Sequence, residues 1–80
     1  MNIKGVAFGI ARDIVGGSEF KIEVKEGASV ADFKKILCIQ YPAFEQLKSF
    51  AIAIGEEYQE DDYVLEEKSE VVIIPPVSGG

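Results

Sequence analysis

Residues 70–80 read E-V-V-I-I-P-P-V-S-G-G, and this stretch decides the fold. Residues 71–74 form a continuous β-branched run, which is typical of a central strand that is covered on both faces. Directly after this run, Pro75 and Pro76 fix φ and favour an extended path that excludes a helix. We therefore expect a central strand over residues 70–74, followed by an extended tail over residues 75–80.

Three other segments predict strands. Residues 20–25 alternate between apolar and charged side chains, as in a half-buried strand. Residues 2–8 also have the pattern of a strand, with Gly5 as a weak point. In residues 49–54 large apolar side chains alternate with two alanines, which again fits a strand. Together with residues 70–74, these segments predict a mixed sheet of four or five strands.

One main helix is expected between the second and third of these strands. Ser29 is a candidate N-cap with Asp32 three residues later, and Pro42 stops the helix. Its apolar stripe consists of Val30, Phe33, Leu37 and Tyr41. A shorter helical turn over residues 10–15 ends at a pair of glycines. The chain is therefore predicted to be one α+β domain, residues 1–74, with the sheet wrapped on one helix and residues 75–80 as its tail.

Composition narrows the classes of function. The chain has 80 residues, no His and a net charge of −6. A chain this short buries only roughly 60–65% of its unfolded surface, which leaves little room for an enclosed active site. Without His, the commonest general base and metal ligand is missing. The acidic charge argues against nucleic-acid binding and favours a basic protein partner.

The chain is expected to be cytoplasmic. Cys38 is the one cysteine, no leader sequence opens the chain, and no apolar run approaches the ~20 residues of a membrane span. We interpret Cys38 as structural or incidental, because a catalytic thiol needs an electropositive setting. The acidic run over residues 56–62 is interpreted as a solvated loop, since it lacks the spacing of a calcium loop, and no metal site is expected.

The tail has the features of a reactive end that another protein uses. Fully extended, it reaches on the order of 20 Å. Val77 and Ser78 offer side chains that a partner could grip, whereas Gly79 and Gly80 offer none, which suits a narrow channel. The carboxylate of Gly80 needs activation, for example by transfer to AMP, and the chain has no glycine-rich phosphate loop. We therefore expect a carried substrate, not an enzyme.

Four segments carry a resemblance to a known family. They are F-G-I-A-R-D-I-V-G at residues 8–16, E-G-A-S-V-A-D-F at 26–33, Y-P at 41–42 and E-V-V-I-I-P-P-V-S-G-G at 70–80. Together they resemble the β-grasp sulfur-carrier family, most closely the small subunits of molybdopterin synthase. The closing P-P-V-S-G-G is the most specific segment. The chain departs from the family pattern at Gly55, where Asn is usual, and over residues 68–70, where Gly-Asp-Glu is usual.

The resemblance implies a ubiquitin-like β-grasp fold with a flexible C-terminal tail and a defined chemistry. An ATP-dependent activating enzyme would adenylate Gly80, and sulfur would replace the AMP to leave a thiocarboxylate. The tail would then enter the large catalytic subunit of molybdopterin synthase and donate its sulfur to a cyclic pyranopterin precursor in molybdenum cofactor biosynthesis. ATP would be used by the partner, this chain would bind no cofactor, and two copies would join two large subunits in a heterotetramer.

The resemblance also implies partner contacts. They are apolar at Phe8, Tyr58 and Ile74, and polar at Arg12, which would face the activating enzyme. For the three apolar residues, ordinary core positions are an equal alternative. The function also has two alternatives: a protein modifier joined to lysines through Gly80, or a sulfur carrier for another route, such as thiamine or tungsten cofactor synthesis.

Overall fold

The computed structural model describes residues 1–47 and 50–75. In this part of the chain, five strands, two α-helices and a 3-10 helix follow one another. Their bounds are β1 Asn2–Ala7, α1 Gly9–Val15, β2 Glu19–Glu23, α2 Val30–Gln40, the 3-10 helix Pro42–Gln46, β3 Ala51–Ile54, β4 Glu57–Gln59 and β5 Glu70–Ile74.

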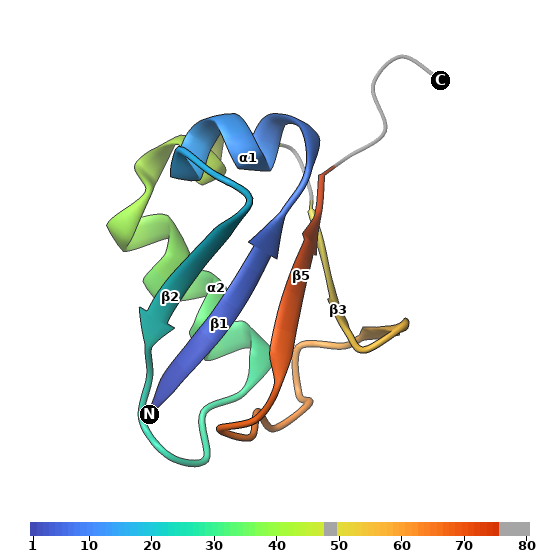
Figure 1. Ribbon diagram of the computed structural model, residues 1–80. Helices are drawn as coiled ribbons and strands as arrows, with labels where there is room; N and C mark the ends of the chain where they lie inside the picture. The colour runs from blue at the N-terminus through green and yellow to red at the C-terminus, as the bar shows by residue number, and fades with distance from the viewer. Residues whose placement is uncertain (48–49, 76–80) are drawn as a thin grey trace.

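The strands form one mixed sheet in the order β2-β1-β5-β3-β4. The central pair, β1 and β5, is parallel, and the other three pairs are antiparallel. α2 lies across one face of the sheet, and α1 follows the end of β1 (Figure 1). The predicted α+β fold, with a mixed sheet on one main helix, is confirmed, and so is the central position of the strand over residues 70–74.

The core forms where the apolar stripe of α2 meets the sheet. In β2, Phe20 and Ile22 are buried between exposed charged residues, as their alternation predicts. Val30, Phe33 and Leu37 of α2 are fully buried against them, and α2 ends at Gln40, before Pro42. The largest fully buried side chains are Phe33, Phe44, Ile3, Ile22, Leu37, Ile52, Ile73, Val30 and Val71.

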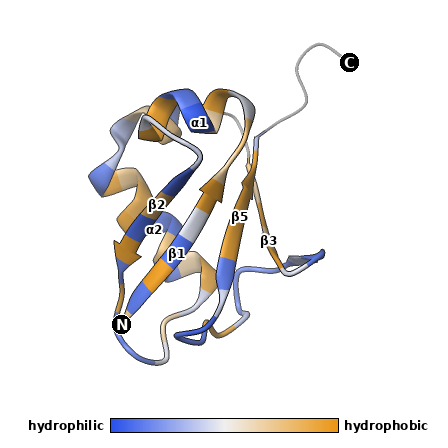
Figure 2. Ribbon diagram, viewed as in Figure 1, coloured by the Kyte–Doolittle hydropathy of each residue, from blue (hydrophilic) through white to orange (hydrophobic). Residues whose placement is uncertain are grey.

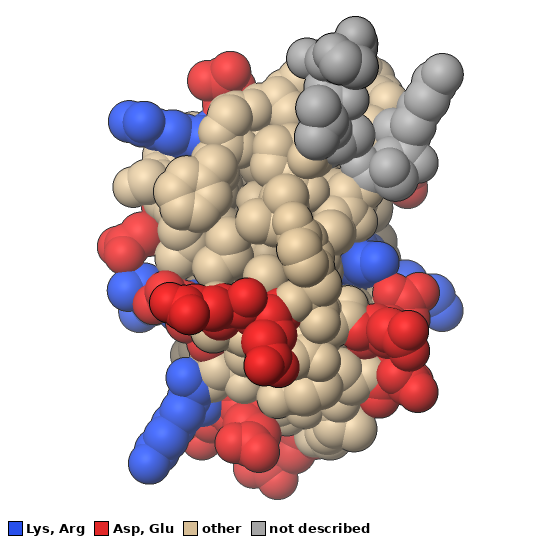
Figure 3. Space-filling view, turned by 90° about the vertical axis from the view of Figure 1, so that its right-hand side faces the viewer, with Lys and Arg blue, Asp and Glu red and all other residues tan. Residues whose placement is uncertain are grey.

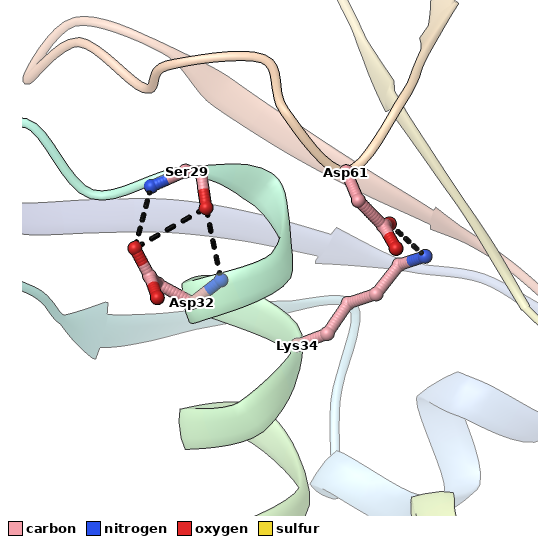
Figure 4. A network of polar contacts seen from close by, with 4 residues as sticks. All are labelled: Ser29, Asp32, Lys34 and Asp61. Atoms are coloured by element: carbon pink, nitrogen blue, oxygen red, sulfur yellow. Dashed lines mark hydrogen bonds and ion pairs between the residues drawn. The ribbon is translucent and has the colours of Figure 1, made fainter.

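A capping box begins α2. The Asp32 N–H donates to the hydroxyl of Ser29, and the Ser29 N–H donates to the Asp32 carboxylate at 3.0 Å (Figure 4). Two N–H groups that a helix leaves without partners are satisfied in this way. The hydrogen bonds from Ser29, the backbone N–H first and then the hydroxyl, lower the pKa of Asp32.

The connection from β4 to β5 is bound to the same end of α2. The N–H groups of Val30 and Ala31 donate to the carbonyls of Tyr63 and Asp61, at 2.9 and 3.0 Å. The ammonium of Lys34 lies 2.8 Å from the Asp61 carboxylate (Figure 4). Part of the acidic run is therefore a structural element and not only a solvated loop.

Three sequence interpretations need correction. The acidic run contains β4, whose three residues are too few to show a period of two. The connection after Pro42 is a 3-10 helix that buries Phe44 at 1% exposure. β5 is central but is not covered on both faces, because Val72 and Ile74 are only half-buried.

Gly5 is a packing position, not a weak point. It lies opposite Phe20 in the β1–β2 register, and a Cβ on Gly5 would clash with the end of the Phe20 ring. The ring therefore occupies the space that the glycine leaves open. Phe20 also packs edge-on against Tyr41, with the ring centroids 6.1 Å apart, so it has little freedom to move aside.

We expect Gly5→Ala to destabilise the fold by roughly 1–3 kcal/mol, because the methyl group displaces a buried aromatic ring. Thermal unfolding followed by circular dichroism measures the effect. Gly17→Ala is the control, since a Cβ on Gly17 meets only the Glu19 carbonyl, at 4.0 Å. Equal melting temperatures for the two variants would contradict this account of the packing.

The capping box makes stability depend on pH. The Asp32 carboxylate contributes above its unfolded-state pKa, about 3.9, and this contribution is lost as the pH falls through the lowered pKa of the folded state. We expect Asp32→Asn to unfold at lower urea concentration than wild type at pH 7, with the gap narrowing below about pH 5. A gap that stayed constant down to about pH 2 would show that the charge of Asp32 has no such role.

Candidate functional site

The outer face of the sheet, opposite α2, carries apolar side chains where polar ones are usual. Val71 and Ile73 are fully buried, so the alternation along β5 turns Val72 and Ile74 to the other face. Both are half-buried. Figure 2 shows that β5 is apolar along most of its length and polar only at its start. Antiparallel strands with one face in solvent usually alternate apolar and polar residues. The apolar residues on the outer face of β5 therefore need another explanation.

Strand register arranges the outer apolar residues in two rows. The first row runs Val6, Val72, Ala53, Tyr58 across β1, β5, β3 and β4. In the second row, Ile74 pairs with Ala51. Phe8 is extended, with φ −128° and ψ 159°, so it continues the alternation of β1 and takes the outer face beside this row. We call the seven residues Val6, Phe8, Ala51, Ala53, Tyr58, Val72 and Ile74 the apolar face.

The apolar face contains exposed side chains and is not part of the core. Phe8 is 54% exposed and Tyr58 is 70% exposed. Ala53 is buried, yet it does not belong to the core cluster under α2. The core alternative is therefore wrong for Phe8 and Tyr58, whereas Ile74 is half-buried and lies outside the core cluster. The apolar face thus has an exposed aromatic side chain at each end and half-buried or buried residues between them, and this makes it a candidate interaction site.

Charged residues border the apolar face at the other end of the sheet. The Lys4 ammonium lies 2.9 Å from the Glu19 carboxylate and 3.5 Å from that of Glu70. In Figure 3, acidic side chains gather over the lower half of the molecule, and most of the upper half beside the grey residues is uncharged. Along β5, the outer face changes from the charged residue Glu70 to the apolar residues Val72 and Ile74.

The predicted tail begins at the edge of the apolar face. Ala7 pairs with Ile73, so the parallel strands β1 and β5 end side by side, and Pro75 follows at once. Arg12 is exposed on α1, and no carboxylate of the described residues lies within ion-pairing distance of it. The other predicted tail residues, Pro76, Val77, Ser78, Gly79 and Gly80, lie outside the described residues.

Reactive groups are few in the described part of the chain. Burial, and secondly the Glu45 carboxylate, raise the pKa of the Cys38 thiol, which favours the unreactive protonated form. Within residues 1–47 and 50–75, no group of His, Cys, Asp and Glu could hold a metal ion. No described helix is long and apolar enough to span a membrane.

The family resemblance named Phe8, Tyr58 and Ile74, which lie on the apolar face, but it did not name Val6 and Val72, which are neighbours in the first row. Their signal is present in the sequence. The alanines that alternate along β3 leave room on one face of the sheet, and this is the face on which Val72 and Ile74 lie. A continuous apolar run does not reveal whether its second face meets a helix of the same chain or another protein.

The chain is similar in sequence to known proteins over its whole length. The model of the ThiS family matches residues 7–80. A molybdopterin synthase sulfur carrier subunit from Chlamydomonas reinhardtii is 34% identical, and the match covers all of both sequences. One from Arabidopsis thaliana is 30% identical over all of this chain and 84% of its own length.

Solved structures share the fold. A putative molybdopterin converting factor subunit 1 from Pyrococcus furiosus has a TM-score of 0.87 at 26% identity, covering 96% of this chain and 99% of its own. Small archaeal modifier protein 1 from Methanosarcina acetivorans has a TM-score of 0.78 at 26% identity, covering 99% and 96%. A chain from the complex of subunits 1 and 2 of the Helicobacter pylori molybdopterin-converting factor has a TM-score of 0.67 at 22% identity, with full coverage of both chains.

The predicted ubiquitin-like β-grasp fold is confirmed by these neighbours. The family match extends over most of the chain, from the end of β1 through the apolar face to Gly80. The resemblance of its sequence segments to sulfur carriers is confirmed as well. This chain belongs to the ThiS family.

Proposed function

We propose that this chain is the sulfur carrier subunit of a molybdopterin synthase. The carboxylate of Gly80 attacks the α-phosphate of ATP in an activating enzyme, and pyrophosphate leaves. A sulfur nucleophile at the oxidation level of sulfide then attacks the acyl carbon, AMP leaves, and Gly80 becomes a thiocarboxylate. In the large subunit the thiocarboxylate sulfur bonds to a carbon of a cyclic pyranopterin precursor. Water then attacks the acyl carbon of Gly80 and its C–S bond breaks, so the sulfur stays on the pterin and the carboxylate returns. The names of the curated relatives support this function.

One observation carries the proposal: the apolar face ends where β5 leads into P-P-V-S-G-G. A partner that covers this face stands beside the start of the tail. Aromatic residues such as Phe8 and Tyr58 are enriched in the buried centres of interfaces. Pro75 and Pro76 would then aim the tail, Val77 and Ser78 would be gripped, and Gly79 would give clearance for Gly80 in the partner's active site.

The proposed roles of this chain and of its partners follow from the chemical groups that the chain has. The described residues offer no phosphate-binding loop and a Cys38 thiol that burial keeps protonated, so the catalytic groups belong to the partners. The large subunit would cover the apolar face, and the activating enzyme would in addition contact Arg12 and supply ATP. We place this exchange of partners in the cytoplasm, with residues 1–74 as the folded carrier domain.

A protein modifier is the second candidate. It is favoured by the similarity to small archaeal modifier protein 1 from Methanosarcina acetivorans at 26% identity. The activated Gly80 would then form an isopeptide bond with a lysine of another protein. Peptides that carry the Gly80 remnant on lysine, found in digests of the host proteome, would support this candidate.

The apolar face predicts a local effect on binding. We expect Tyr58→Ala to weaken binding to the large subunit by 2 kcal/mol or more, roughly 30-fold, because exposed aromatic side chains are frequent hot spots. Its unfolding free energy should change by less than about 0.5 kcal/mol, since the side chain is 70% exposed. Calorimetric titration measures the affinity. Ile39→Ala is the control, because Ile39 is 78% exposed on α2, away from the apolar face. Equal affinities for the two variants would contradict the proposed interface.

The tail predicts a chemical change at one residue. We expect incubation with ATP, the activating enzyme and a sulfur donor to raise the intact mass by the replacement of one oxygen with sulfur, located in the C-terminal peptide. A variant with one residue added after Gly80 should keep its fold and gain no sulfur. If wild type remained a carboxylate where a known carrier is converted, the sulfur-carrier function would be wrong and the modifier candidate would take its place.

A further inference from the structure

The outer edge of β2 is open to a further strand. β2 is the outermost strand of the sheet on the side away from β4 (Figure 1). Met1 and Val24 exchange backbone hydrogen bonds, and bonded pairs alternate with non-bonded pairs along an antiparallel ladder. The N–H and C=O groups of Glu19, Lys21 and Glu23 therefore point away from β1. In the described part of the chain, none of them bonds to the backbone of another element.

The charges along this edge alternate in sign. Glu19, Lys21, Glu23 and Lys25 are exposed, whereas the residues between them are buried. The Glu19 carboxylate lies 2.9 Å from the ammonium of Lys4, and no ion pair within the described residues involves the other three. Charges of one sign would repel a second copy of the edge. The pattern E-x-K-x-E-x-K is instead complementary to its own antiparallel copy.

One antiparallel register brings all these charges opposite their counterparts. It places Ile22 of each copy at the two-fold axis. Lys21 then lies opposite Glu23 of the second copy, and their outward N–H and C=O groups form ladder hydrogen bonds. Glu19 lies opposite Lys25 of the second copy in the same way. Moving one strand by two residues places Lys21 opposite Lys21 and Glu19 opposite Glu23, so the neighbouring register is repulsive.

The flank of α2 on the side of β2 is apolar and open. Lys34 reaches Asp61 on the side of β4, and Ile36, about 200° further around the helix, lies on the opposite flank. A groove of about 460 Å³ runs between this flank and residues 25–28, and Ile36 and Ile39 are among the residues that line it. Antiparallel pairing of β2 with its copy places both α2 helices on the same face of the joined sheet, with these flanks toward each other.

We infer that β2 is a self-association edge, through which two copies of this chain join their sheets in the register centred on Ile22. The alternating charges select the register on the outer face, and the α2 flanks add apolar contact on the inner face. The interface is small, so the association is weak and depends on concentration. The apolar face extends across β5, β3 and β4, away from this edge, so both copies keep it uncovered. The inference does not depend on the proposed function.

Sedimentation equilibrium of the full chain tests the association without any partner protein. At low salt we expect the apparent mass of wild type to rise from monomer toward dimer as the concentration increases to about 1 mM. Hydrogen exchange locates the contact. The N–H groups of Lys21 and Glu23 should become protected as the concentration rises, whereas those of Phe20 and Ile22 bond to β1 and should be protected throughout. A wild type that stays monomeric, or a dimer in which Lys21 and Glu23 exchange at an unchanged rate, overturns the inference.

Charge reversal tests the register. Lys21→Glu and Glu23→Lys each place like charges opposite one another on both sides of the two-fold axis, and we expect each to weaken the dimer by roughly tenfold or more. In a mixture of the two variants, one carries carboxylates and the other ammonium groups at both positions, so a heterodimer should form with an affinity near that of wild type. Lys68→Glu is the control, because it makes the same change in net charge as Lys21→Glu at an exposed turn outside β2. Its dissociation constant should stay near that of wild type.

Glu23→Lys distinguishes this register from general repulsion between acidic molecules. It brings the net charge of −6 closer to zero, so general repulsion alone predicts stronger association for this variant. Weaker association of Glu23→Lys, with recovery in the mixture, supports the inference. Stronger association of Glu23→Lys, or a mixture that stays monomeric while circular dichroism shows both variants folded, overturns it.

Discussion

The parallel pairing of β1 with β5 is the constraint on which the rest of the structure depends. Parallel strands need a long crossover, and here the crossover contains β2, α2, β3 and β4, so every other element is placed around this pair. Because the two strands point the same way, they end at the same edge of the sheet. The beginning of the tail, the turn into α1 and the second row of the apolar face therefore lie together. A hairpin in place of this pair would separate them.

The two faces of the sheet are stabilised in different ways. The inner face is covered by α2 and buries large side chains such as Phe33 and Leu37, which provide the hydrophobic driving force of folding. The outer face leaves Phe8 and Tyr58 in water, at no benefit to the isolated domain. This surface gains from burial only in a complex. Under the proposed function, the inner face mainly provides stability and the outer face of the same strands provides binding.

Much of this arrangement could be predicted from the sequence, and the errors have physical causes. Residues 20–25 and the helix after Ser29 were predictable because each has a clear period and a cap or turn at its end. β4 was missed because three residues show no period, and its pairing with β3 is a tertiary contact. Val72 was assigned to a strand covered on both faces. Sequence analysis cannot distinguish an apolar residue that is buried under a helix of the same chain from one that a partner protein would cover.

The β1–β5 pair also has a consequence for the order of folding. Lys4 pairs with Glu70, nearly the whole length of the chain away, so the loop that this pair closes carries the largest entropic cost in the sheet. The β3–β4 hairpin pairs Ile54 with Glu57, which are close neighbours along the chain, so it forms at lower cost. Both rows of the apolar face need β5 in place, and they are therefore completed late. A partially folded chain lacks a complete apolar face, so a partner that docks on this face, as we propose, would bind only molecules that have finished folding.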